Sequence, residues 1–77
     1  MIHTELITIT LTEGNTNDEN LTLIFNEKIE EGVHRFGEYK GSLLLSDYTN
    51  LAGSRFVKFF ATFAIKDMPG FSPSKKG

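Results

Sequence analysis

The chain has 77 residues, of which 39% are hydrophobic, so it can build one small core but has no room for a second folded unit. It contains no cysteine, which excludes disulfide bonds and thiolate metal sites. Its formal net charge of −2 is too small to indicate a polyanionic partner by itself. We expect one globular domain over residues 1–70 and a C-terminal tail over residues 71–77.

The charges are unevenly distributed, because acidic residues dominate residues 1–38 and basic residues dominate residues 39–77. Such asymmetry is typical of a nucleic-acid-binding face or of complementary surfaces between subunits. The N-terminus shows neither a basic leader nor a continuous apolar run. We therefore expect a soluble cytoplasmic protein that makes no membrane contact.

Residues 2–12 alternate apolar side chains with threonines, a pattern that predicts a first β-strand. Residues 13–20, EGNTNDEN, are polar and rich in turn formers, which predicts a hairpin loop. Residues 21–25 alternate again and are expected to form a second strand that pairs with the first.

At Asn26 the apolar period changes, and Ile29, Val33 and Phe36 recur with helical spacing. Asn26 can cap a short helix, and His34 and Arg35 suit its last turn. Gly32 disfavours a helix by about 1 kcal/mol relative to alanine, so an irregular extended segment is the alternative.

Residues 42–47 predict a third strand, with Leu43 and Leu45 facing the core and Leu44 facing away. After a loop over residues 48–54, the aromatic stretch up to Asp67 predicts a fourth strand. The expected fold class is α+β, a four-stranded antiparallel sheet with the order ββαββ and one short helix packed on one face. An all-β meander or a small barrel is the alternative.

The predicted fourth strand has two faces of different character. Val57, Phe59, Phe63 and Ile65 alternate as a core face, whereas Phe56, Lys58, Phe60 and Lys66 mix rings with cations on the other. Left open on a monomer, such a face is an association site.

The first hypothesis for this face is single-stranded nucleic acid, with rings for base stacking and cations for phosphates. The candidate binding residues are Lys40, Tyr48, Arg55, Phe56, Lys58, Phe60 and Lys66. Residues 52–59, AGSRFVKF, partly resemble the central-strand signature of RNA-recognition motifs. The matching positions are Gly53, Phe56, Val57 and Phe59. Half of the signature is missing, and the 18 residues after Phe59 are too few for the remaining helix and strand of that domain, so we do not assign the family.

The second hypothesis, which we prefer, is that Phe56 and Phe60 are buried against a second copy of the chain or under the tail, with the lysines at the rim. We found no nucleophile motif, facing carboxylate pair or metal-ligand spacing, and therefore expect no catalysis, no cofactor and no bound metal. The expected function is a small non-catalytic binding or regulatory protein of the inhibitor or adaptor type, a class that includes phage-borne proteins of this size. We expect it to form a homodimer and to contact a protein partner.

Overall fold

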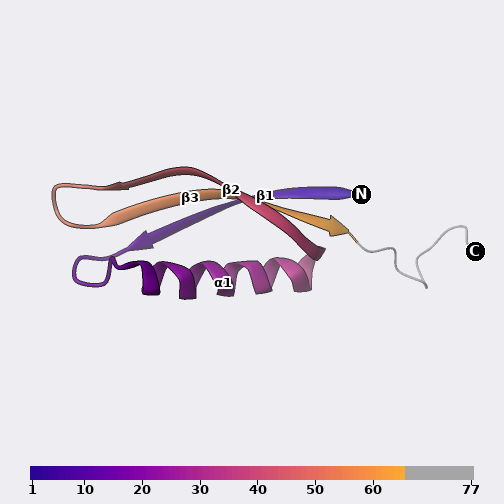
Figure 1. Ribbon diagram of the computed structural model, residues 1–77, viewed down its shortest axis with the longest axis horizontal. Helices are drawn as coiled ribbons and strands as arrows, with labels where there is room; N and C mark the ends of the chain where they lie inside the picture. The colour runs from indigo at the N-terminus through magenta and orange to yellow at the C-terminus, as the bar shows by residue number, and fades with distance from the viewer. Residues whose placement is uncertain (66–77) are drawn as a thin grey trace, which may run out of the picture.

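The structure is a computed structural model that describes residues 1–65. Four elements follow one another along this part of the chain: β1 (Ile2–Leu11), α1 (Asp18–Arg35), β2 (Gly37–Thr49) and β3 (Arg55–Ile65) (Figure 1). The predicted tail over residues 71–77 and the candidate residue Lys66 lie outside the described residues. Within residues 1–65, the fold is α+β, as the sequence predicts.

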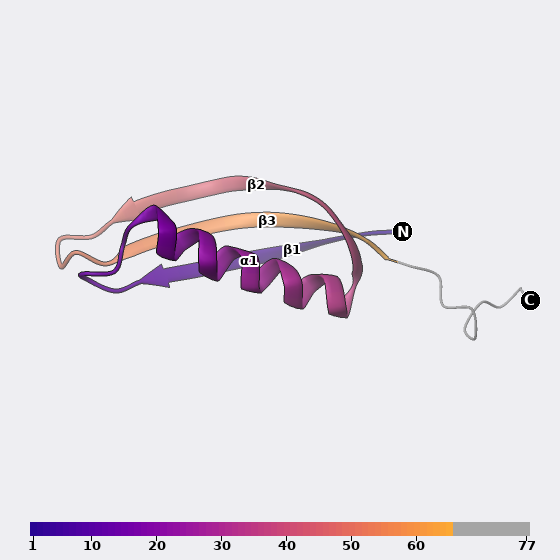
Figure 2. The same ribbon diagram turned by 60° about the horizontal axis from the view of Figure 1, so that its bottom comes forward.

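The three strands form one sheet with the order β1-β3-β2. Both outer strands pair antiparallel with β3, so β1 and β2 run in the same direction with β3 between them. The connection from β1 through α1 to β2 is therefore a split β-α-β unit. Figure 2 shows α1 running diagonally across one face of this sheet.

The predicted fold of four strands in the order ββαββ is wrong, and so are the all-β alternatives. Residues 21–25, which we assigned to a second strand, belong to α1, and the helix begins at Asp18 instead of at Asn26. The cap is Asn17, whose side chain accepts a hydrogen bond of 2.8 Å from the backbone N–H of Asn20. Asp18 and Glu19 then occupy the first turn, where carboxylates oppose the positive end of the helix dipole.

The described strand β2 is longer than the predicted third strand and has a different register. Two irregularities interrupt its pairing with β3, one between Tyr39 and Gly41 and one between Leu44 and Ser46. Each places an extra residue in β2 and shifts the alternation of side chains beyond it. As a result, Leu43 pairs opposite Phe60 and Leu44 opposite Phe59, so the predicted facing of these two leucines is reversed.

The core lies between α1 and the sheet. Its buried residues come from the edge strand β1 and the central strand β3: Ile7, Ile9, Leu11, Val57, Ala61 and Phe63. Leu21, Ile24, Phe25, Ile29 and Phe36 pack against it from the helix side. The predicted core face of the last strand is thus confirmed for Val57 and Phe63, whereas Val33 of the predicted helix face is 39% exposed.

Gly32, whose low helix propensity disfavours a helix in the sequence analysis, is buried within α1. A methyl group at this position would overlap the ring of Phe63. The glycine therefore allows close approach of helix and sheet, and this packing outweighs its low helix propensity.

Candidate binding surfaces

The sheet face opposite α1 is uncovered in the described part of the chain, and we call it the open face. Three apolar side chains lie side by side in one row across it, because Phe60 pairs with Leu6 of β1 and with Leu43 of β2. Their exposed fractions are 51% for Leu6, 40% for Phe60 and 63% for Leu43. An exposed apolar row shared by all three strands is a candidate interaction surface.

The next two rows of the open face carry polar and aromatic side chains. Lys58 pairs with Thr8 and with Ser46, so its exposed side chain stands between two hydroxyl-bearing residues. In the row beyond it, Phe56 pairs with Tyr48, and their rings stack with centroids 5.2 Å apart. The structure thus brings together four of the predicted binding residues: Tyr48, Phe56, Lys58 and Phe60.

Arg55, another predicted binding residue, lies on the helix side of the sheet and is committed to internal contacts. It donates two hydrogen bonds to Asp47, of 2.9 and 2.7 Å. It also donates to Asp18 and to the carbonyl oxygen of Thr16, each at 2.9 Å. Its side chain is 18% exposed, so it acts as a link between the β2–β3 hairpin and the start of α1 rather than as a ligand for phosphate.

The charges of this link perturb each other. The hydrogen bonds from Arg55 lower the pKa of Asp47 from its ordinary value of 3.8. Hydrogen bonds to Asp47 and then to Asp18 raise the pKa of Arg55, so the guanidinium stays charged at every accessible pH.

Lys40, another predicted binding residue, does not join the cluster of Tyr48, Phe56, Lys58 and Phe60. It occupies the first irregularity of β2, and its ammonium lies 3.8 Å from the carboxylate of Glu38. Within residues 1–65, Lys58 is then the one predicted cation that stands on the open face without an acidic partner within salt-bridge distance. A continuous cationic track for a phosphate backbone is not formed by the described residues.

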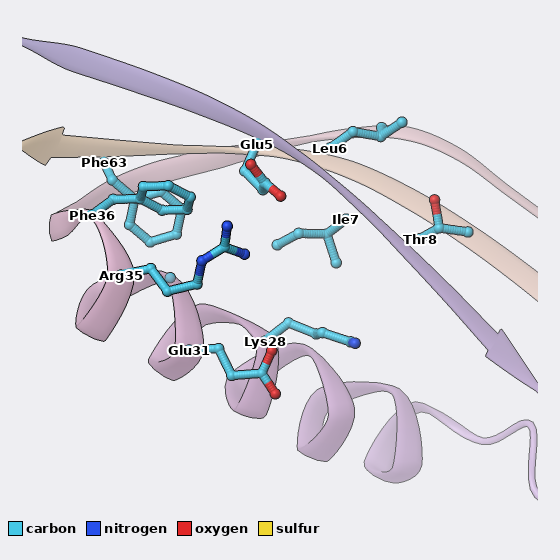
Figure 3. A pocket seen from close by; sticks show the side chains of 10 residues that line it. Glu5, Leu6, Ile7, Thr8, Lys28, Glu31, Arg35, Phe36 and Phe63 are labelled. Atoms are coloured by element: carbon cyan, nitrogen blue, oxygen red, sulfur yellow. The ribbon is translucent and has the colours of Figure 1, made fainter.

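A second surface, which the sequence did not reveal, is a groove of about 180 Å³ between β1 and α1 (Figure 3). Residues 5–8 of β1 form one wall, and Lys28, Glu31 and Arg35 of α1 form the other. Figure 3 shows the Arg35 side chain extending from α1 toward β1, with its guanidinium between the Phe36 ring and Ile7. Helical spacing of Lys28, Glu31 and Arg35 is visible in the sequence, but only knowledge of the strand order places them beside β1.

At one end of this groove, side chains of β1 contact side chains at the C-terminal end of α1. His3 lies 2.8 Å from the carboxylate of Glu5, and its ring stacks on Phe36 with centroids 3.9 Å apart. The guanidinium of Arg35 lies 4.8 Å from the centroid of the same Phe36 ring. The groove therefore has an ordered, mixed-charge lining.

Residues 1–65 contain no cluster of three or more side chains suited to hold a metal ion. No helix in this part of the chain has the length and apolarity needed to cross a membrane. Comparison with protein-family models, with curated proteins and with solved structures finds no match.

Proposed function

We propose that the chain is a non-catalytic binding protein, of the inhibitor or adaptor type, that contacts a protein partner through the open face. The observation that carries this proposal is the apolar row of Leu6, Phe60 and Leu43, which crosses all three strands and stays exposed. Rows of this kind supply the desolvated centre of protein interfaces.

The charge of the open face favours a different protein over a second copy of the chain. Lys58 stands next to the apolar row, and a second copy would bring another Lys58 to the same surface. Glu38, the acidic residue of this face, lies at its far end and already neighbours Lys40. The partner we propose has an apolar centre and a carboxylate that meets Lys58, since a desolvated lysine needs an opposite charge.

Single-stranded nucleic acid is the second candidate, and the stacked pair of Tyr48 and Phe56 is the observation that favours it. Aromatic rings on an open sheet are platforms for bases, each worth about 1–3 kcal/mol. The candidate is weaker than the first because Arg55 and Lys40 are held by carboxylates. Lys58 alone provides little of the phosphate attraction that such binding needs.

Two leucines of equal exposure allow a matched test of the preferred function. Leu43 on the open face is 63% exposed, and Leu23 on the outer side of α1 is 62% exposed. Serine at either position removes the same side chain at small cost in stability, because neither leucine is buried. Affinity capture from the native host should recover a stoichiometric protein with the parent chain and with Leu23→Ser, and lose it with Leu43→Ser.

Two results would overturn the proposal. One is capture that is equally strong with Leu43→Ser and with Leu23→Ser. The other is recovery of nucleic acid alone, together with binding of labelled single-stranded RNA or DNA that Phe56→Ala abolishes. The second result would instead establish the nucleic-acid candidate.

A further inference from the structure

The two edges of the sheet are built differently. β2 is interrupted twice in its pairing with β3 and carries Gly41 and Lys40 at the first interruption. Bulges and lysines are the features by which proteins prevent an edge strand from pairing with another chain. β1 pairs with β3 without interruption over its ten residues and contains neither proline nor lysine. Of the strands that the structure describes, only β1 is thus suited to accept a further strand.

The direction of the backbone groups on β1 follows from one hydrogen bond. The N–H of Ile65 donates to the carbonyl oxygen of Met1 at 2.8 Å. Because hydrogen-bonded pairs alternate along an antiparallel ladder, the odd-numbered residues of β1 bond to β3 and the even-numbered ones point away from it. The outward residues are Ile2, Thr4, Leu6, Thr8 and Thr10. In residues 1–65 no strand lies on that side of β1.

We propose that β1 pairs antiparallel with β1 of a second copy, so that two chains form one continuous six-stranded sheet. A two-fold axis near Leu6 or Ile7 brings the outward groups of both strands together and leaves the helices on the same side of the sheet. Side chains then stay on their own faces, since the pairing joins even-numbered residues with even-numbered ones. The open face of each copy remains free and becomes part of a surface of double width.

Charge complementarity in the groove selects a second copy as the occupant. Glu5 is the only carboxylate of β1, and a two-fold axis at Leu6 or Ile7 sets Glu5 of the second copy opposite Ile7 or Ile9. That position lies on the helix side of the sheet, where Lys28 and Glu31 of α1 line the groove and the Lys28 side chain extends toward Ile7 (Figure 3). Each copy thus offers a carboxylate where the other offers an ammonium group.

The inference does not depend on the proposed function, and purified protein tests it. Sedimentation over a range of concentrations should show a reversible dimer. Thr8→Pro should abolish it, because proline removes an outward N–H and leaves the ladder with β3 complete. Ser42→Pro is the matched control on β2, since Ser42 pairs opposite Ala61, whose hydrogen bonds go to β1, and its own N–H points outward. This variant should dimerise like the parent chain.

Two further variants decide the matter if Thr8→Pro fails to fold. Glu5→Lys and Lys28→Glu should each weaken the dimer alone, because like charges then meet in the groove. An equimolar mixture should form a mixed dimer, since each copy supplies the charge that the other has lost. In addition, a synthetic chain with an N-methyl group on Leu6 should raise the dissociation constant at least about tenfold.

A monomer at all concentrations would overturn the proposal. So would a dimer that Ser42→Pro abolishes and Thr8→Pro retains, or two charge variants that fail to combine. Loss of the dimer through Phe60→Ser, with Thr8→Pro unaffected, would place the second copy on the open face instead and contradict both this inference and the proposed function. If a variant loses the captured protein partner of the proposed function but still dimerises, the result bears on the proposed function alone and leaves the strand pairing standing.

Discussion

Gly32 of α1 lies against the ring of Phe63 of β3, and the two residues together set how closely the helix approaches the sheet. Phe63 is completely buried, and the bare backbone of Gly32 provides the space for its ring. The helix contains a glycine here because a side chain does not fit.

Gly32→Ala should therefore destabilise the protein although alanine is the better helix former. The overlap with Phe63 costs about 1–3 kcal/mol, and the gain in helix propensity returns about 1 kcal/mol. Urea unfolding measures the net loss. The same substitution should cost less in a Phe63→Leu background, where the smaller side chain leaves room. A Gly32→Ala protein that is more stable than its parent would contradict this packing.

The beginning of α1 provides a second prediction. Asn17→Ala should lower the free energy of unfolding by about 1 kcal/mol, because the side chain caps the helix through Asn20. Asn26→Ala should leave stability unchanged or raise it slightly, since Asn26 is exposed inside the helix and alanine has the higher propensity. Thermal unfolding compares the two variants, and the opposite order of stabilities would restore the helix start expected from the sequence.

These two positions show how far the sequence predicts the fold. The strand β1 and the burial of Val57 and Phe63 in β3 are confirmed, because a strict period of two over about ten residues has no helical counterpart. Residues 21–25, LTLIF, contain one polar residue among four apolar ones, and so short a run fits a helix equally well when a cap such as Asn17 precedes it. The interruptions of β2 depend on pairing with β3, which no local pattern encodes.

The candidate surface was predicted in part for a similar reason. The period of two correctly places Phe56, Lys58 and Phe60 on one face. The same pattern does not show that Arg55 is unavailable. Asp47 of the neighbouring strand and Asp18 of α1 both accept hydrogen bonds from its guanidinium. Pairing between distant residues is decided by the three-dimensional fold.

The link at Arg55 leads to a third prediction. Asp47→Asn should lower the thermal unfolding midpoint more than Asp18→Asn, because Asp47 accepts two hydrogen bonds from Arg55 and Asp18 accepts one. The side chain of Asp18 is also 88% exposed, so water screens its contact with Arg55. Equal effects of the two substitutions would show that the double contact with Asp47 does not stabilise the hairpin.

A fourth prediction concerns acid. The pKa of Asp47 is lowered by Arg55, so the contact stabilises the fold above the ordinary carboxyl pKa of 3.8. This contribution should disappear as the pH falls through the lowered pKa, because Asp47 is then protonated in the folded state and its carboxyl group no longer carries the charge that attracts Arg55. Urea unfolding between neutral and acidic pH should show a smaller decline for Asp47→Asn than for the parent chain. Parallel declines would contradict the lowered pKa, which carbon-detected NMR titration of the carboxyl group measures directly.

The central claim is that the open face contacts a protein, and site-specific photo-crosslinking tests it most directly. A photoreactive residue replaces Leu43 in one variant and the equally exposed Leu23 in the other, and both are irradiated in the native host. We predict a crosslink to one protein from position 43, weakened by Lys58→Glu, and none to that protein from position 23. The same crosslinked protein from both positions, or nucleic acid as the sole product from position 43, would contradict the account.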